Sequence, residues 1–339
     1  MTLKINSKTI GVAALLAAVS VAVLLAWRQA VPAAPSGPAF SMTVGVPTQL
    51  SAGAVFVADQ RQLFAQQGLA VGIQRFLLGK LALAAVLDGK ADFAIVAETP
   101  FALAVLRGAR IATLGTVFES RKSIAIAARG DSGVSDTASL AGKRIGTVLG
   151  TNAEFFLDTM LEVHGVERAQ VEVIDLKAGD LVAALRSKRV DAITAWNPDL
   201  ARIVQESGGR GVLLYGEDLF VHRFLLVARQ DYIDANGPQV KALLAALRQA
   251  NDFIKGNPEQ ARSMLGPEVG LSPALLEPSF DPTDFTLVLD QSLLLAISVQ
   301  MRWAAAKGLV KAGAAPNYLD FMRPEPLTAV APDAVRIIR

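Results

Sequence analysis

Small polar residues follow several short apolar runs of this chain, at the point where each run ends. The clearest case is "GKRIGTVLGTNAEFFLDTMLEVHGV", residues 142–166, in which a short apolar run meets Gly150, Thr151 and Asn152 just before a long helical pattern. The first amides of a helix lack intrahelical partners and carry a partial positive charge, so such a turn can hold an anion. Gly150 would admit a ligand to the backbone, and Thr151 would add a hydroxyl donor. The same residue types are also ordinary helix caps, and the stretch alone fits either role.

Four further strand-like runs end in small or polar residues ahead of a helix, at Thr48-Gln49, Leu78-Gly79, Glu98-Thr99-Pro100 and Trp196-Asn197-Pro198. Five such ends in one chain favour ligand binding over capping. Trp196 would offer a flat apolar wall with an N–H donor, and a packing role is its alternative. Glu98 would bind a ligand amine or cap a first helical turn. The candidate ligand residues are Gln49, Gly79, Glu98, Thr99, Gly150, Thr151, Asn152, Trp196 and Asn197.

The sequence gives little support to catalysis, metal binding or nucleotide binding. The "GDSG" at residues 130–133 resembles a serine-protease motif, but the only histidines, His164 and His222, come later and beside no evident Ser–Asp pair. The absence of cysteine excludes a thiol nucleophile, a disulfide and a Cys-ligated metal. Two isolated histidines argue against structural zinc, and neither GxGxxG nor a Walker A pattern is present. We therefore expect no enzyme, no cofactor and no metal.

The elements that must position these residues alternate between strand and helix. Strands are expected at residues 42–47, 69–76, 91–97, 111–118 and 123–129, with helices at 52–68, 80–90 and 99–108 between them. After a turn-rich stretch at 130–142, a second series follows, with strands at 143–149, 171–176, 191–196 and 211–216 and helices from Ala153, at 180–189 and at 198–207. This rhythm predicts an α/β fold in which mostly parallel sheets are flanked by helices.

Two segments of similar character predict that the chain crosses twice between two lobes. "SIAIAARGDSG" and "RFLLVARQDYI" are both apolar strands that leave through Ala-Arg, so we expect Arg129 and Arg229 near the crossings. Residues 42–128 would form the first part of lobe 1, 129–222 lobe 2, and 223–339 the return crossing, the rest of lobe 1 and C-terminal helices. From Pro238 onward the pattern is mainly helical. Ligands of such sheets bind outside the carboxyl ends of the strands, which predicts a ligand cleft between the lobes.

The N-terminal residues have the pattern of a targeting segment. Lys4 and Lys8 precede an uncharged apolar run from Thr9 to Trp27, and a Pro/Ala linker at residues 29–41 follows Arg28. The run is close to the length that spans a bilayer, so residues 1–28 are expected to be a signal peptide or a signal anchor. The positive residues place the N-terminus in the cytoplasm and the body outside. Both cleavage and retention, with residues 9–27 as an anchor in the cytoplasmic (inner) membrane, stay open.

The charge balance of the body argues against nucleic-acid binding. The formal net charge is +2, and without Lys4, Lys8 and Arg28 the remaining chain has 30 basic and 31 acidic residues. A nearly neutral body has no basic footprint for nucleic acid. We expect a monomer that binds a small molecule.

Several segments resemble one known family. They are "RQLFAQQGLAV", "LAAVLDGKADFAIVAETP", residues 123–166, "LVAALRSKRVDAITAWNPDLARI" and the tail "PNYLDFM…AVAPDAVRIIR". With them, residues 42–339 resemble the solute-binding proteins of ABC importers for nitrate, taurine and alkanesulfonates, with their pyrimidine-precursor relatives. The resemblance implies a type II periplasmic-binding-protein fold that closes on one small molecule. It also implies cleft-loop roles for Gln49, Gly79, Glu98, Thr99, Thr151, Asn152 and Trp196.

The chain departs from the family at two places. It lacks a Cys for lipid attachment, and the loop "PTQLSAG" lacks the aromatic residue that many members place there. The resemblance implies a periplasmic or extracytoplasmic protein that captures a small solute by lobe closure and delivers it to ABC permease subunits. That solute would be anionic (sulfonate, nitrate or taurine-like) or heteroaromatic. The alternatives are a membrane-tethered ligand sensor and an enzyme on the same fold, although this chain lacks the Cys- and His-rich segments of the pyrimidine-making relatives.

The targeting pattern makes a testable prediction. A periplasm-dependent reporter fused at about residue 45 should be active, because Lys4 and Lys8 hold the N-terminus inside while the apolar run directs the following chain outward. A cytoplasm-dependent reporter at the same junction is the control. Activity of the cytoplasmic reporter alone would contradict export.

Overall fold

The computed structural model describes residues 40–216, 218–310 and 316–338. The apolar run at 9–27 and most of the linker lie outside these residues. In the described part of the chain, no helix has the length and apolar character needed to cross a membrane.

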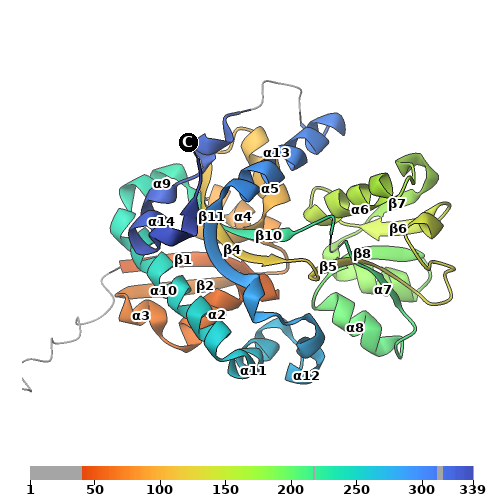
Figure 1. Ribbon diagram of the computed structural model, residues 1–339, viewed down its shortest axis with the longest axis horizontal. Coiled ribbons are helices and arrows are strands. Elements are labelled where there is room, and N and C mark those ends of the chain that lie inside the picture. Colours follow the sequence, from red (N-terminus) through yellow and green to blue (C-terminus); the bar gives the residue numbers. More distant parts are fainter. Residues whose placement is uncertain (1–39, 217, 311–315, 339) are drawn as a thin grey trace, which may run out of the picture. The chain divides into compact units, whose positions relative to one another are not determined.

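The described chain forms two β-sheets, which lie side by side in Figure 1. The larger sheet has the order β12-β11-β4-β10-β3-β1-β2, built from β1 (Phe40–Pro47), β2 (Leu69–Phe76), β3 (Phe93–Ala97), β4 (Ile111–Ser120), β10 (His222–Arg229), β11 (Phe285–Asp290) and β12 (Val335–Arg336). The smaller sheet has the order β7-β6-β8-β5-β9, built from β5 (Ile124–Ala128), β6 (Arg144–Thr147), β7 (Glu172–Asp175), β8 (Ala192–Trp196) and β9 (Val212–Leu214). Each sheet with its helices is called a lobe below, lobe 1 for the larger sheet and lobe 2 for the smaller.

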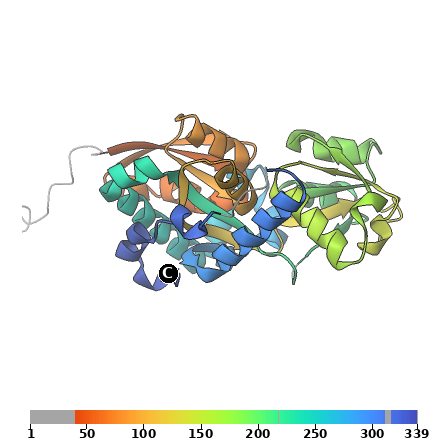
Figure 2. The same ribbon diagram turned by 90° about the horizontal axis from the view of Figure 1, so that it is seen from above.

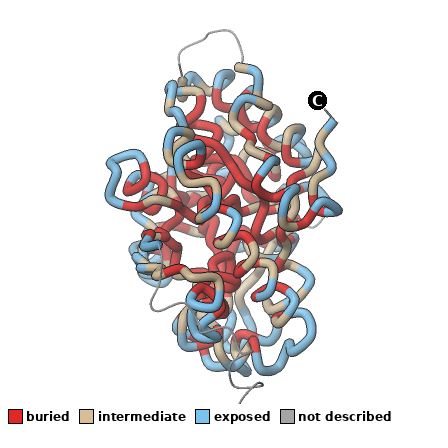
Figure 3. The backbone as a smooth tube through the Cα atoms, turned by 90° about the vertical axis from the view of Figure 1, so that its left-hand side faces the viewer, coloured by how far each residue is buried: buried red, intermediate tan, exposed pale blue. Residues whose placement is uncertain are grey.

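Helices cover both sheets. Those of lobe 1 are α2 (Gly53–Gln60), α3 (Leu63–Gln66), α4 (Gly79–Leu87), α5 (Glu98–Leu106), α9 (Gln230–Ala235), α10 (Gly237–Gly256), α11 (Pro258–Val269), α12 (Pro273–Leu276), α13 (Gln291–Ala306) and α14 (Pro324–Val330). Those of lobe 2 are α6 (Asn152–Val163), α7 (Leu181–Arg186) and α8 (Asp199–Glu206). Buried residues are concentrated in the interior, with exposed turns outside (Figure 3). Separate hydrophobic clusters fill the two lobes, as a chain of this length allows.

Both sheets are mixed, whereas the sequence predicted mostly parallel ones. In lobe 1, β1 pairs in parallel with β2 and β3, but β10 runs antiparallel to both β3 and β4. In lobe 2, β6 is parallel to β7 and β8, and β5 is antiparallel to β8 and β9. The reason is the way the chain crosses between the lobes. It leaves lobe 1 at the C-terminal end of β4 and re-enters the sheet at the same end, as β10, so β10 must run antiparallel to β4.

Another prediction is wrong in part. The helix expected at 52–68 is interrupted, because Gln62 adopts a left-handed conformation with φ of 57° between α2 and α3. The region after Pro238 is mainly helical, as predicted, but it also supplies β11, which pairs with β4 in the larger sheet. Its "FTLVLD" sequence alternates buried and half-buried residues. This period-2 pattern is short and lies among helices, which hid it.

The crossings lie elsewhere than predicted. The chain passes from β4 to β5 at residues 121–123 and returns between Leu214 and His222. The division expected after Ala128 therefore falls one strand too late, because β5 already belongs to the smaller sheet. Arg129 follows β5 and Arg229 ends β10, in both cases at the end of the strand that is remote from the crossings, so their predicted place beside the crossings is wrong. The two segments look alike because each is an apolar strand in the interior of its own sheet.

His222 is buried where the returning chain enters lobe 1. Its Nδ1 lies 2.8 Å from Oγ of Ser123 in the first crossing, and its Nε2 contacts the side-chain amide of Asn152 at the start of α6. Phe224 packs against its ring at 4.6 Å between centroids. Burial lowers the pKa of His222 from 6.5 to about 3. A neutral imidazole thus ties both crossings to lobe 2, and such a low pKa makes it a poor general base for Ser123.

This burial predicts an acid-sensitive contribution of His222 to stability. The unfolded state binds a proton at His222 below about pH 6.5 while the folded state does not until about pH 3, so the contribution is present above 6.5 and is lost as the pH falls. Linkage gives a loss of about 2–3 kcal/mol between pH 7 and 4.5. In urea titrations, the destabilisation caused by His222→Gln should shrink over that range.

The chain's other histidine supplies a matched control. His164 is more exposed, and its Nδ1 lies 2.8 Å from the carbonyl oxygen of Met160. The His164→Gln variant, measured in the same urea titrations, is the control for the loss of an exposed imidazole. A His222→Gln curve parallel to that of the parent would contradict the buried, neutral state of His222.

Candidate ligand-binding cleft

Residues from both lobes meet in a narrow crevice of about 20 Å³. Lobe 1 contributes the ends of β1 and β3 and the start of α4, and lobe 2 contributes the start of α6 and the end of β8. The lining residues are Gln49, Leu78, Gly79, Lys80, Ala97, Pro100, Thr151, Asn152, Trp196 and Phe224. Five of them were predicted from sequence as ligand residues. The space is close to that of one water molecule, so the lobes are closed on each other here.

Gly79 lies where α4 begins against the end of β3. A Cβ at this position would be 2.8 Å from the carbonyl oxygen of Ile95 and 3.0 Å from Cα of Val96. Glycine is therefore required for the close approach of the helix to the strand, whatever binds in the crevice. This approach brings the first turn of α4 to the wall of the crevice.

The turn at residues 150–152 has capping geometry. Oγ1 of Thr151 accepts from the amide of Ala153 at 3.2 Å and donates to the carbonyl of Val148 at 2.6 Å. Gly150 has a positive φ of 67°, and its amide donates to Oε2 of Glu154 at 2.8 Å. The Thr151 hydroxyl proton is thus engaged within the turn, in contrast to the free donor expected from sequence. Of the three residues, Thr151 and Asn152 line the crevice.

Glu98 and Thr99 are buried beneath the crevice and do not line it. Glu98 is fully buried, its Oε2 accepts from the amide of Arg223 at 3.0 Å, and its Oε1 has no hydrogen-bond partner in the described chain. Burial raises the pKa of Glu98 to about 7, against the opposing charge of Arg223. Thr99 donates to the side chain of Gln300. The structure therefore does not bring these two side chains to the place expected for direct ligand contact.

A wider cavity of about 600 Å³ continues from the crevice between the lobes. It shares Gln49, Leu78 and Trp196 with the crevice and adds Asn197. Charged residues of both signs lie in its wall, and each is paired: Arg202 with Asp199 at 3.0 Å, Arg186 with Glu206, and Glu268 with Arg75 at 2.7 Å. Trp196 is only 5% exposed, so a small part of the residue contributes to the wall while the rest is packed. A molecule larger than a simple anion would extend into this cavity.

Lys80 is the residue that the sequence analysis missed. It is the charged side chain in the crevice lining, and its Nζ donates to the carbonyl oxygen of Leu149 across the cleft at 3.3 Å. Burial lowers the pKa of Lys80, with Asp175 and Glu154 opposing the shift. A cation in the first turn of a helix opposes the helix dipole. That local conflict, one residue after Gly79, is the signal that would have found it.

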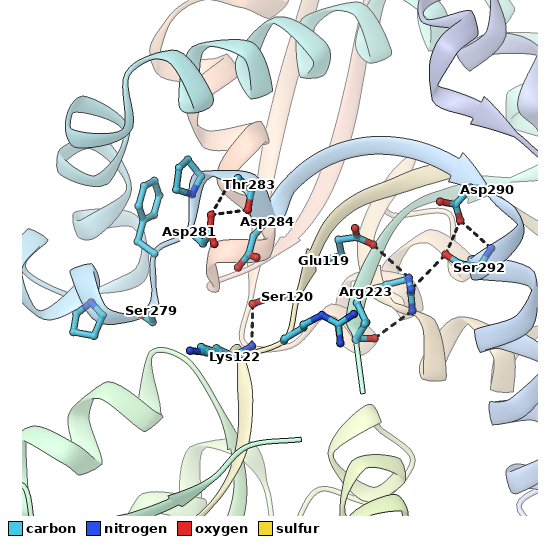
Figure 4. A pocket seen from close by; sticks show the side chains of 15 residues that line it. Glu119, Ser120, Lys122, Arg223, Ser279, Asp281, Thr283, Asp284, Asp290 and Ser292 are labelled. Carbon is cyan, nitrogen blue, oxygen red and sulfur yellow. Dashed lines mark hydrogen bonds and ion pairs between the residues drawn. The ribbon is translucent and has the colours of Figure 1, made fainter. Parts of the chain in front are cut away.

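A second large cavity, of about 620 Å³, lies on the β11 side of the two crossings (Figure 4). Its wall includes Glu119, Lys122 and Arg223, together with residues 278–284, Asp290 and Ser292. Arg223 is held by Glu119 at 3.5 Å, and burial raises the pKa of Asp284 to about 7. None of the predicted ligand residues lies there. Among the described residues, no three His, Cys, Asp or Glu side chains converge as a metal site would require.

Comparisons with solved structures identify the fold. The chain superposes on the periplasmic aliphatic sulphonate binding protein SsuA of Escherichia coli with a TM-score of 0.71 at 20% identity, over 80% of this chain and 94% of that one. It superposes on SsuA of Xanthomonas axonopodis bound to MOPS with a TM-score of 0.72 at 23% identity, over 82% and 96%. The desulfurization enzyme DSZB gives 0.70 at 17%, over 86% and 99%. These likenesses confirm the predicted two-lobe fold of periplasmic binding proteins.

Sequence comparisons identify the family. A protein of Brucella abortus named as a binding protein is 28% identical over 208 residues, which are 60% of this chain and 64% of that protein. A protein of Bacillus subtilis named for binding aliphatic sulfonates is 24% identical over 203 residues, 59% and 60% of the two chains. The alignments thus span less than two thirds of these relatives. The sequence profile described as "NMT1/THI5 like" matches residues 50–261. Because this match covers more than half of the chain, the chain belongs to the NMT1/THI5-like family.

Proposed function

We propose that this protein is an extracytoplasmic solute-binding protein that captures a small anionic solute by lobe closure and delivers it to an ABC permease. One observation carries the proposal. Gln49 and Gly79 of lobe 1 and Thr151, Asn152 and Trp196 of lobe 2 line a single crevice. The two lobes are joined by two short crossings, so a hinge motion there would open the crevice to solvent and close it on a ligand.

The crevice favours an anionic group. Helices α4 and α6 begin at its wall, and the partial positive charge at the start of each helix attracts negative charge. Lys80 adds a half-buried cation, so an anion placed beside it would stabilise the closed lobes. The names of the Bacillus subtilis and Escherichia coli proteins refer to aliphatic sulfonates. We propose a sulfonate or a similar oxyanion, with its remaining atoms in the wider cavity beside Trp196.

The proposed place of the protein follows from the same family. An importer's binding protein works outside the cytoplasmic membrane, and the pattern at Lys4, Lys8 and residues 9–27 suits export to that side. If this segment is retained, it would tether the binding lobes close to the permease. A tethered sensor would use the same lobes and differ only in the partner that detects their closure.

The fold does not separate binding from catalysis, since DSZB shares it. The chemistry of the side chains favours binding. One DSZB structure is a Cys-to-Ser variant in complex with biphenyl-2-sulfinic acid, and this chain has no cysteine. Its Ser123–His222 pair is buried, and a histidine pKa of about 3 makes the imidazole a poor base for the serine at neutral pH.

A thermal-shift screen of the full chain in mild detergent tests the function. The probes would be taurine, short alkanesulfonates, MOPS, nitrate and a pyrimidine, each with a cationic analogue of similar size as its control. A ligand at 100 times its Kd should stabilise the protein by about 2.7 kcal/mol. Mass spectrometry of the recovered probe should find it unchanged. Stabilisation only by cations, or conversion of the probe to a product, would contradict the proposal.

Lys80 gives the sharpest prediction about the ligand. Lys80→Met should weaken the anion that stabilises best in the screen by about tenfold to a hundredfold, because a charge-assisted hydrogen bond contributes roughly 1.5–3 kcal/mol. Titration calorimetry at two salt concentrations measures the change. Lys90→Met is the matched control, since Lys90 is 72% exposed and pairs with Asp88 at the other end of the same helix.

Thr151→Ala separates capping from ligand contact in the same assay. It should lower the unfolding free energy by about 1 kcal/mol, as the loss of a helix cap does. Ligand affinity should change little, because the hydroxyl proton already goes to Val148. If Lys80→Met and the parent bound the anion with equal affinity, the proposed contact between Lys80 and the ligand would be wrong.

A further inference from the structure

Helix α13 is fixed to lobe 1 along most of its length. It follows β11 directly, and the carboxylate of Asp290 caps it by accepting from the amides of Ser292 at 3.0 Å and Leu293 at 3.3 Å. Further along, Gln300 is buried to 2% exposure against α5 and accepts from the hydroxyl of Thr99. In Figures 1 and 2 the helix runs from the body of lobe 1 toward α6 of lobe 2.

The last turns of α13 contact α6. The ring of Trp303 packs edge-on against Phe155 with 5.3 Å between centroids, and its Nε1 donates to Oδ2 of Asp158 at 2.8 Å. One turn later, Nζ of Lys307 lies 2.6 Å from the same Oδ2 and 2.9 Å from Oε1 of Glu154. The side chains of Glu154 and Asp158 are only 3% and 14% exposed. Removing Lys307 would therefore leave two largely desolvated carboxylates of lobe 2 without one of their partners.

Glu154 connects this contact to the crevice. While Oε1 pairs with Lys307, Oε2 accepts from the amide of Gly150 at 2.8 Å. Gly150 opens the turn whose next two residues line the crevice. A continuous chain of short polar contacts thus runs from Lys307 in the C-terminal part of lobe 1 to the turn at 150–152 in lobe 2.

We infer that Lys307 and Trp303 are positioning residues, which hold the turn at 150–152 through Glu154 and keep α6 closed against lobe 1. Their contact is a non-covalent link between the lobes, in addition to the two crossings of the chain. Residues 303 and 307 lie beyond the stretch that the family profile matches, 50–261. The role of this turn in ligand binding rests on the proposed function, whereas the link between the lobes is independent of it.

The test measures the distance between the lobes without any ligand. The chain has no cysteine, so the changes Ala65→Cys on α3 and Arg189→Cys after α7, both at exposed positions, provide a unique pair of spin labels. In the labelled full chain, Lys307→Met should shift the interspin distribution to longer distances and broaden it. Amide exchange across residues 150–152 should become faster, on the order of tenfold.

Three further variants make the outcome decisive. Arg302→Met removes an exposed cation from the same helix and should leave both readouts at the parent's values, whereas Lys307→Arg should restore them. Trp303→Phe keeps the ring contact with Phe155 and loses only the donor to Asp158, so it should give a smaller shift toward longer interspin distances. This variant provides the test if Lys307→Met does not fold. Parental distances and exchange rates in Lys307→Met, or in Trp303→Phe where the former fails to fold, would overturn the inference. No measurement here needs a ligand, so a failed ligand screen would leave this result standing.

Discussion

The chain enters and leaves each sheet at the strand ends that face the other sheet, and the geometry of the cleft depends on this constraint. Because β4 leads into β5 and the chain returns into β10, the carboxyl ends of β1, β2 and β3 must look toward those of β6 and β8. His222 stands at this passage, with Ser123 on one side of its ring and Asn152 on the other. An uncharged, buried imidazole at this point joins the two crossings to the first residue of α6, so the hinge and the candidate ligand turn share one set of contacts.

Charges that are partly or fully removed from water gather where the lobes meet. Lys80 reaches across to Leu149, Glu98 lies beneath the crevice, and Lys307 faces two carboxylates of α6. Separation of the lobes would return several of these groups to water, whereas closure requires each to find a partner. Lys80 donates to the carbonyl of Leu149, and the carboxylates of Asp175 and Glu154 act on it electrostatically. In the proposed function, an anionic ligand adds negative charge beside Lys80 when the lobes close, which is the physical reason that binding and closure would be coupled.

The family's fold hosts both binding and catalysis, so the distinction must come from side chains. The crevice here offers helix amides, a lysine, an asparagine and an indole, which are groups that can recognise a polar solute. The part of the chain outside the family profile has a structural share in the site as well. It supplies β11 to the larger sheet and α13 to the contact with α6.

The sequence by itself determined the order of the elements, the strand ends that carry ligand-type residues, and the family. These are local properties: an apolar run with a period, a glycine at a sharp turn, or a Thr before a helix has much the same meaning wherever it folds. The tertiary structure alone decided which strand ends meet, and it brought Gln49, Gly79, Thr151, Asn152 and Trp196 together while leaving Glu98 and Thr99 below the surface. It also decided the direction of β10, the recruitment of β11, the engagement of the Thr151 hydroxyl and the exposure of Lys80 to the crevice. Each of these depends on partners far away in the chain, and the local pattern of a segment does not say which distant segment it will pair with.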